Sequence, residues 1–323
     1  MTDVSNLFQS KVVQAPMAGV TDWAFRAMER KFGGELLFSE MLSADSLVRH
    51  HRRTLKMMQT DKNEKNTAVQ LYGHDPQTMA LAAKIVRNET AAVLIDVNMG
   101  CPVRKITSAG SGAALMKTPD LAAAIVEKTA GAVTCPVTVK CRLGQNESDK
   151  NFLPFCKRME QSGAAAIFLH ARTVAQGYSG RADWDAIALL KASLFIPVIG
   201  NGDVFDKKDA FDMLVRTRAD AVMIGRGLLG KPWFLSETAA FLAHEKTPFV
   251  PVGKDLCRIV LEHFSLLEEY YGKRQAVFVA RKHLAWYSAG LKGAADFRKR
   301  LFGLEDKSAV FDAVNDFFGK CDD

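Results

Sequence analysis

One cysteine lies a few residues after an apolar segment, in a stretch where we expect a strand to end. Residues 91–95 are aliphatic, as in a strand that is buried on both faces. Pro102 has no backbone N–H to donate to a neighbouring strand, so we expect the strand to end near Asn98 and the next loop to present Cys101. A thiol in such a loop is a candidate for chemistry, although a lone cysteine is more often a small core residue.

Cationic and amide side chains follow other apolar segments. Lys140 and Arg142 follow one of them, and His170 and Arg172 follow the next. A lysine buried at the end of a strand is costly unless it faces an anion. A reduced flavin is such an anion, and a cation beside it stabilises the reduced form. Gln70 has both an amide donor and an amide acceptor, which suits the pyrimidine edge of a flavin.

Two glycine-rich segments follow the last two apolar runs before residue 230. They are Gly200-Asn201-Gly202-Asp203 and Gly225-Arg226-Gly227. Both allow backbone N–H groups to approach a phosphate closely, and Arg226 adds a positive charge. One such segment could simply form a tight turn, but two of them at the ends of successive strands favour a phosphate site.

The segments that position these residues are short apolar runs separated by helical patterns. Helices are expected to begin at Asp75-Pro76 and Thr118-Pro119, each with an N-cap residue before a proline. Further helical patterns cover residues 184–190 and 209–215. The predicted strands are Val12–Ala15, Glu35–Phe38, Thr67–Leu71, Val93–Val97, Pro136–Lys140, Ala165–Leu169, Ile196–Ile199 and Asp220–Ile224.

Eight strand–helix units within about 240 residues predict an α/β fold, a (β/α)8 TIM barrel. In such a barrel, active-site residues lie at the C-terminal ends of the strands, and phosphate groups commonly bind after strands seven and eight. A doubly wound open sheet is the alternative. It would usually carry a GxGxxG turn after its first strand, which Pro16-Met17-Ala18-Gly19 lacks.

The pattern changes near Thr247-Pro248-Phe249-Val250-Pro251, which has the composition of a linker. Only helical patterns follow it, because apolar residues recur there at helical spacing. We therefore predict two domains: a barrel over residues 1–245 and a small helical bundle over residues 250–323. The predicted helices of the bundle are 255–271, 276–288, 294–302 and 308–318.

The composition limits the class of protein. The chain has 323 residues and a formal net charge of +7, which fits a nucleic-acid partner without requiring one. No apolar run approaches the ~20 residues needed to span a bilayer, and residues 1–9 lack the core of a signal peptide. The six cysteines show no CxxC pair and no metal-site spacing. We expect a cytoplasmic protein with free thiols, no resident metal and no membrane partner.

Several segments resemble, in the right order, the motifs of the tRNA-dihydrouridine synthases. They are APMAGVTD at 15–22, DVNMGCP at 96–102, GSGAAL at 110–115, VKCRLG at 139–144, HART at 170–173, QGY at 176–178, IGNGDV at 199–204 and MIGRG at 223–227. The segment ARKHLAWY at 280–287 resembles the helical domain of the bacterial B-type subgroup. The resemblance runs from about Val12 to Phe317. Gly200 and Ala171 are small departures, which remove no functional side chain.

The resemblance implies an FMN enzyme that reduces a specific uridine of tRNA, in the D-loop, to 5,6-dihydrouridine, with NADPH as the reductant. Reduced FMN would give a hydride to C6 of the uracil, and Cys101 matches the acid that protonates C5. A thiol with a pKa of ~8.5 is mostly protonated at neutral pH and can fill that role. Carried over by motif, FMN would be held by Pro16, Met17, Ala18, Gln70, Lys140, His170, Asn201, Gly202, Asp203, Gly225 and Arg226. The uridine would be held by Asn98, Arg142 and Tyr178.

Three basic clusters fit an RNA surface. They are residues 49–53, the pair Arg281 and Lys282, and residues 298–300. Any single cluster could equally be an ordinary solvated face. Together they predict that tRNA lies across the FMN-binding barrel and a tRNA-binding helical domain, held mainly through its phosphates. We expect a monomer and no DNA partner.

Two other functions remain open at this point. An FMN barrel that acts on a free pyrimidine, such as a dihydroorotate dehydrogenase, would not need the basic helical region. An RNA-binding protein that keeps the barrel without turnover would not need Cys101, Lys140, His170 and Arg226 together.

Overall fold

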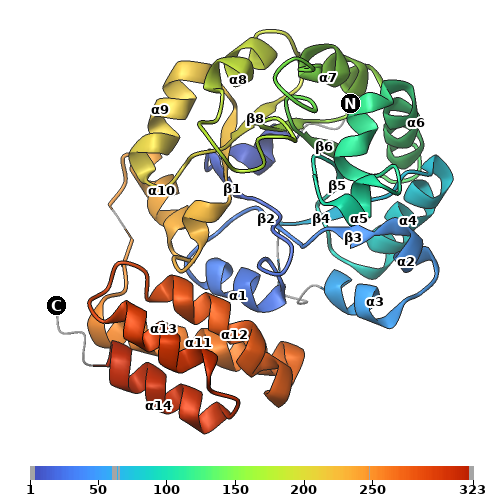
Figure 1. The fold of residues 1–323 in the computed structure, drawn as a ribbon. Coiled ribbons are helices and arrows are strands. Elements are labelled where there is room, and N and C mark those ends of the chain that lie inside the picture. The colour runs from blue at the N-terminus through green and yellow to red at the C-terminus, as the bar shows by residue number, and fades with distance from the viewer. Residues whose placement is uncertain (1–3, 60–63, 65, 247, 320–323) are drawn as a thin grey trace.

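The computed structural model describes residues 4–59, 64, 66–246 and 248–319, and its centre is a ring of parallel strands (Figure 1). The strand order is β1-β9-β8-β7-β6-β5-β4-β2, and β3 pairs with the end of β4. The strands are β1 Val12–Gln14, β2 Leu37–Phe38, β3 Leu42–Ser43, β4 Thr67–Tyr72, β5 Leu94–Met99, β6 Val137–Cys141, β7 Ile167–His170, β8 Val198–Asn201 and β9 Ala221–Ile224.

One buried glutamine closes the ring between β1 and β2. The backbone N–H of Gln14 donates to the carbonyl of Leu36 at 3.2 Å. Its side-chain oxygen accepts from the N–H of Phe38 at 2.8 Å. The sheet therefore closes on itself, so the predicted (β/α)8 barrel is confirmed and the open doubly wound sheet is wrong.

Each predicted strand coincides with an observed one, but β3 was not predicted. Residues 39–41 interrupt the second strand, and the chain pairs again at Leu42 and Ser43 with Leu71 and Tyr72. Two paired residues are too few to show the alternation that identifies a strand in a sequence.

Helices surround the ring of strands (Figure 1). Asp75 caps α4 as predicted, because its carboxylate accepts from the N–H of Thr78 at 2.8 Å. Thr118 does not cap α6 in this way; its hydroxyl donates instead to the carbonyl of Leu115 at 3.5 Å. The helices are α1 Trp23–Lys31, α2 Ala44–Val48, α3 Arg52–Met58, α4 Pro76–Glu89, α5 Arg104–Thr107, α6 Pro119–Ala130, α7 Phe152–Gln161, α8 Trp184–Lys191, α9 Lys207–Thr217 and α10 Phe234–Leu242, with short 3-10 turns η1 Ser5–Phe8, η2 Gly112–Lys117 and η3 Arg226–Leu228.

The interior of the barrel is filled by side chains. The ring of Phe168 contacts Phe38 at 5.2 Å and Phe8 of η1 at 6.0 Å between centroids, both edge to face. These rings belong to one buried apolar cluster with Val13 and Ile199. Since the interior is packed, a ligand can reach the strands only at their ends.

Four helices after residue 252 form a second core. It includes Ala24 and Met28 of α1 and also Trp233, so the helical region packs directly on the barrel beside α1 (Figure 1). None of the described helices is both long enough and apolar enough to cross a bilayer. Thr247 of the predicted linker lies outside the described residues. The helices are α11 Gly253–Tyr271, α12 Lys273–Tyr287, α13 Ala294–Phe302 and α14 Lys307–Phe318.

The helical region also holds the loop that follows β1. The hydroxyl of Tyr271 donates to Asp22 at 2.8 Å, and Asp22 in turn caps α1. The ammonium of Lys282 donates to the carbonyl of Gly19, and the N–H of Gly19 donates to the carboxylate of Glu40. A loop of the barrel is thus fixed from both sides.

Two buried histidines lie where the helical region meets α1. The rings of His263 and His283 are 4.6 Å apart, and each lies within 6 Å of the ring of Phe25. Burial lowers the pKa of both, that of His263 to about 3, and the charge of Lys282 lowers both further. Both imidazoles are therefore neutral in the folded protein near pH 7.

We predict that acid destabilises this junction. Below pH ~6.5 the unfolded chain binds protons at His263 and His283 that the folded chain does not, so stability falls by up to about 1.4 kcal/mol per pH unit for each histidine. Compared with His283→Phe, the wild type should lose stability more steeply between pH 6.5 and 4.5 in denaturant unfolding. Buried Glu29, whose raised pKa acts in the opposite direction, is common to both proteins. His51→Gln, at an exposed histidine, should keep the wild-type slope; equal slopes for wild type and His283→Phe would contradict the prediction.

Candidate active site

Two adjoining hollows lie at the C-terminal ends of the strands. The one next to Cys101 measures about 400 Å³, within the range of small-molecule sites. The other lies over the glycine-rich ends of β8 and β9. Between them they are lined by every site residue that the sequence singled out, namely Pro16, Met17, Ala18, Gln70, Asn98, Cys101, Lys140, Arg142, His170, Tyr178, Asn201, Gly202, Asp203, Gly225 and Arg226.

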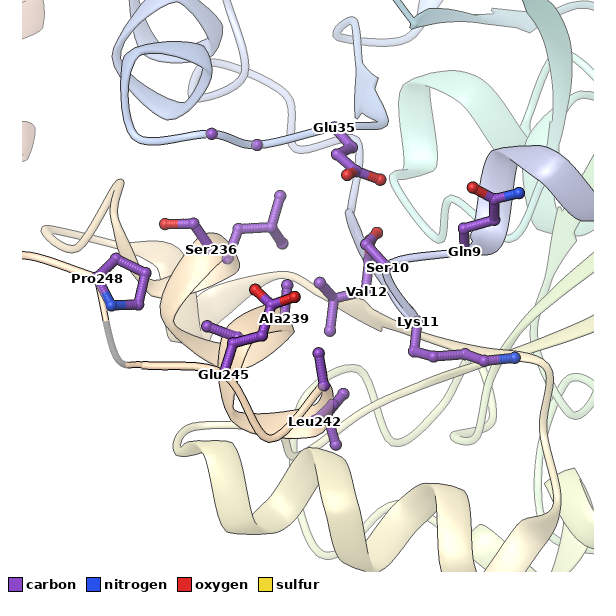
Figure 2. A pocket seen from close by; sticks show the side chains of 15 residues that line it. Gln9, Ser10, Lys11, Val12, Glu35, Ser236, Ala239, Leu242, Glu245 and Pro248 are labelled. Carbon is purple, nitrogen blue, oxygen red and sulfur yellow. The ribbon is translucent and has the colours of Figure 1, made fainter.

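A larger hollow of about 520 Å³ lies at the opposite end of the barrel. Figure 2 shows it between Ser10 and Lys11, which precede β1, and Ser236 and Ala239 of α10. Its charged side chains, such as Lys11, are exposed and do not converge on a point. The candidate site residues that the sequence singled out lie at the other end.

Amide side chains connect the floor of the site to the cysteine loop. Gln70, 1% exposed, donates to Asp96 at 2.7 Å, and its oxygen accepts from the amide of Asn98 at 2.8 Å. The oxygen of Asn98 accepts from the N–H of Cys101 at 2.9 Å and of Gly100 at 3.2 Å. Gln70 thus keeps one amide hydrogen for a ligand, and Asn98 fixes the start of the loop that carries the thiol.

The thiol itself is half-buried in this loop. Burial raises the pKa of Cys101, with opposing effects from the N–H of Val103 and the charge of Arg142, so the group is protonated near neutral pH. The Cys101 carbonyl accepts from Ala113 at 3.0 Å. Gly112 must be glycine here, because a Cβ would lie 2.8 Å from that carbonyl oxygen and its φ is +61°.

A half-buried ammonium lies across the hollow. Lys140 donates to the side-chain oxygen of Asn201 at 3.0 Å, and Asn201 donates to the carbonyl of Met223 at 2.7 Å. Burial lowers the pKa of Lys140 to about 8, and the positive charge of Arg142 adds to this effect while Asp96 opposes it. The cation is therefore held in place by a neutral amide and has no carboxylate directly on it among the described residues.

His170 is surrounded by positive charge. Burial is the main cause that lowers its pKa far below the ordinary value, and the charges of Lys140, Arg142, Arg172 and Arg226 lower it further. The imidazole is neutral, with one N–H to donate and one nitrogen to accept. An anion bound here would relieve the repulsion among these cations.

The loop after β8 is built on an ion pair between a buried arginine and a half-buried aspartate. Both oxygens of Asp203, whose φ is +57°, accept from Arg172 at 2.6 and 2.7 Å. Arg172 also donates to the carbonyls of Ser179 and Gly180. Because the carboxylate of Asp203 is directed at Arg172, any contact of Asp203 with an anion is left to its backbone N–H. A Cβ on Gly202 would lie 2.7 Å from that of Ala182, so this approach requires glycine.

Arg142 and Tyr178 lie at the mouth of the site in different ways. Arg142, 3% exposed, donates to the carbonyls of Gly100, Thr173 and Gly177, and so joins the cysteine loop to the loop after β7. Tyr178 is 61% exposed, and its ring lies over Arg226 at 4.8 Å. Arg142 therefore holds two loops together, whereas Tyr178 presents an exposed aromatic ring.

The sequence assigned no role to Asp96, Arg172 or Thr138. Asp96 could have been found, since an acidic residue inside an otherwise apolar strand must have buried partners. Arg172 stands in the quoted segment at 170–173, yet its carbonyl partners come from a loop whose course the sequence does not show. Thr138 gives no signal, because threonine is common in strands.

The chain is similar to known proteins over almost its whole length. A family model described as "Dihydrouridine synthase (Dus)" matches residues 13–320. The "Probable tRNA-dihydrouridine synthase" of Rickettsia conorii is 40% identical over 321 residues, which cover 98% of this chain and 96% of that protein. The "tRNA-dihydrouridine synthase B" of Pseudomonas syringae pv. tomato is 39% identical over 310 residues, 96% of this chain and 91% of that protein.

Among solved structures, the histamine dehydrogenase from Rhizobium sp. 4-9 matches with a TM-score of 0.55 at 13% identity. The match covers 79% of this chain and 49% of that one, so this chain spans about half the length of that structure. At this identity the likeness concerns the barrel fold alone.

We predict that Arg172→Lys destabilises the protein by about 2–3 kcal/mol. Lysine keeps the buried charge but cannot reach Asp203 and two carbonyls at once, so these half-buried acceptors lose their best partner. Denaturant unfolding gives the free energy. Arg181→Lys, nine residues on and exposed, is the matched control and should change stability by less than about 0.5 kcal/mol. A similar small loss for Arg172→Lys would contradict a structural role for the ion pair.

Proposed function

Because the chain belongs to the dihydrouridine synthase family, we propose that it reduces a uridine in the D-loop of tRNA to 5,6-dihydrouridine, with FMN as cofactor and NADPH as reductant. One observation carries the proposal. The protonated thiol of Cys101 and the half-buried ammonium of Lys140 line the same hollow at the barrel rim.

The residues of the rim fit FMN. A phosphate is suited by the backbone of Gly202, where a Cβ would lie 2.7 Å from that of Ala182, and by the backbone of Gly225 and the charge of Arg226, which line the same hollow. One guanidinium nitrogen of Arg172, Nη1, is buried without a partner among the described residues and lies 3.6 Å from the Cβ position of Gly202. Lys140 and the free amide hydrogen of Gln70 suit the polar edge of the ring. Pro16, Met17 and Ala18 complete the apolar wall.

When bound and reduced by NADPH, FMN supplies a hydride for C6 of the uracil. The chain supplies the proton: the Sγ–H bond of Cys101 breaks as C5 takes up the proton, and the thiolate recovers a proton from solvent through its half-exposed side. Burial favours the thiol form, so the acid is loaded at neutral pH. Lys140 stabilises negative charge on its side of the hollow, and neutral His170 can donate a hydrogen bond there.

The uridine has to leave the stacked tRNA to reach this hollow. Tyr178 stands exposed at the mouth and can offset the lost stacking with its ring. Asn98 and Arg142 line the hollow beside Cys101 and would hold the polar edge of the base. They are themselves held by the protein, so the base would meet a rigid site.

Basic side chains that are already bound within the protein are less available to tRNA than exposed ones. Arg281 donates to the carbonyl of Leu304, and Lys282 holds Gly19. The cluster at 49–53 is exposed throughout. Its last two residues, Arg52 and Arg53, begin α3. In the same helix, the ammonium of Lys56 donates to the backbone carbonyl of Tyr270 of α11 and lies over its ring, and the Tyr270 hydroxyl donates to the carbonyl of Lys56. We place the main phosphate contacts at this seam between the barrel and the helical region.

The cytoplasm is the proposed location. Cys101, Cys135, Cys141 and Cys156 form no disulfide, which fits a reducing compartment. Cys321 lies outside the described residues.

We predict that Cys101→Ala lowers dihydrouridine formation in unmodified tRNA by about 10²- to 10⁴-fold, the usual contribution of a placed acid. FMN binding and its reduction by NADPH should persist. Cys135→Ala, at another half-buried cysteine, is the control and should keep full activity. Near-normal product from Cys101→Ala would remove its role as acid. Reduction of free uridine but not of tRNA would favour the enzyme of free pyrimidines.

We predict that Arg52→Gln with Arg53→Gln weakens tRNA binding and flattens its salt dependence. Each lost phosphate contact lowers the slope of log K against log[salt] by about 0.7–0.9. Filter binding over a range of salt concentrations measures the slope. The control is Lys208→Gln with Arg216→Gln, which removes the same charge from α9 on another side of the barrel. An equal effect of both pairs would show that only net charge matters.

A further inference from the structure

Asp96 lies at the centre of three neighbouring strands and contacts a side chain on each side. The parallel register pairs Gln70 of β4 with Asp96 of β5, and Asp96 with Thr138 of β6. Asp96 is fully buried. One carboxylate oxygen accepts from the hydroxyl of Thr138 at 2.7 Å, and the other accepts from the amide of Gln70 at 2.7 Å. Burial raises the pKa of Asp96 to about 6, and the positive charge of Lys140, two residues beyond Thr138 on β6, opposes this increase.

The chemistry of a carboxylate gives this chain of contacts a direction. An ionised carboxylate only accepts, so the NH₂ group of Gln70 must face Asp96 and its oxygen must face Asn98. Asn98 then has to turn its NH₂ group toward Gln70 and its oxygen toward the loop. That oxygen accepts the N–H groups of Gly100 and Cys101. Each amide orientation is set by the one before it.

A reversed amide would break the chain of contacts. If Gln70 were flipped, its oxygen would face the carboxylate and its NH₂ group would face the NH₂ group of Asn98. If Asn98 were flipped as well, its NH₂ group would face two backbone N–H groups. Buried polar groups that oppose like groups lose their hydrogen bonds and cost far more than exposed ones. Asp96 thus excludes the reversed orientation of the Gln70 amide, with or without reversal of the Asn98 amide.

We propose that Asp96 is a positioning residue for Cys101: through Gln70 and Asn98 it fixes the backbone N–H groups that start the cysteine loop, and so fixes the direction of the thiol. The inference deepens the proposed function, because it assumes that the Cys101 thiol delivers the proton. Asp96 touches neither the thiol nor the hollow directly.

The test compares Asp96→Leu with Asp96→Asn. Leucine has a similar volume but no acceptor, so both amides lose their fixed orientation. Asparagine can still turn its oxygen to Gln70 and its NH₂ group to the hydroxyl of Thr138, which can also accept. It should therefore rescue the positioning although it removes the charge. Thr138→Val is the matched control, because it removes the other hydrogen bond of Asp96 but leaves the acceptor for Gln70.

The first readout needs neither cofactor nor tRNA. Hydrogen–deuterium exchange of the Gly100 and Cys101 amides should be about fivefold faster in Asp96→Leu, as expected when a hydrogen bond worth about 1 kcal/mol is lost. It should stay near the wild-type rate in Asp96→Asn and Thr138→Val. Unchanged exchange in Asp96→Leu overturns the proposal, and so does equally fast exchange in Thr138→Val, which would indicate general damage to the core.

The second readout is single-turnover reaction of the reduced enzyme with tRNA. Asp96→Leu should be about 10²-fold slower, with a larger solvent deuterium isotope effect, because a misplaced donor makes proton transfer limiting. Its reduction by NADPH should be unchanged, and Asp96→Asn should recover most of the rate. If Asp96→Leu does not fold, Gln70→Met interrupts the same chain of contacts and is judged by the exchange readout. Should the wild type form no dihydrouridine, the proposed function fails, while the exchange data still decide whether Asp96 orders the loop.

Discussion

The constraint on which the site depends is the concentration of positive charge, part of it buried, at one rim of the barrel. Lys140, Arg142, Arg172 and Arg226 all lower the pKa of His170, so they lie close enough to repel one another. Buried cations are tolerated only with partners. Arg172 forms an ion pair with Asp203, and Arg142 donates hydrogen bonds to backbone carbonyls. Lys140 has an amide oxygen, and Arg226 has a longer contact of 3.4 Å to Asp203. The remaining excess of positive charge favours a ligand that brings negative charge.

The rest of the molecule holds these cations in place. The packed interior, with Phe8 and Phe168 at its centre, prevents the strand ends from collapsing inward. From outside, the helical region fixes the loop after β1 through Lys282 and Tyr271. Because Met17 stands in that loop and lines both hollows, the helical region takes part in shaping the site as well as extending the surface. Its removal would expose the apolar face of α1, including Met28.

Most of the fold could be predicted from the sequence, because the spacing of apolar residues differs between strands and helices. The strands of the ring and the helices after residue 252 were found in this way. What it missed depends on contacts between distant segments. β3 is defined by its pairing with Leu71 and Tyr72. The hydroxyl of Thr118 donates to the carbonyl of Leu115 instead of capping its helix. The segment around Lys282 suggested RNA contact, yet its ammonium is bound to Gly19.

The site residues divide by what their side chains touch, and the sequence could not show this division. Cys101, Lys140 and Tyr178 present their functional groups to the hollows, whereas Asp203 uses its carboxylate to hold Arg172. Arg142 does both, because it lines the hollow while its Nε and Nη1 donate to loop carbonyls. A motif records only that a residue type is needed at a position. Register decides the rest: Asn98 lies beside Lys140 and His170 beside Asn201, because parallel strands bring those pairs level. The same register places Asp96 between Gln70 and Thr138, and so makes a buried carboxylate part of how the thiol is aimed.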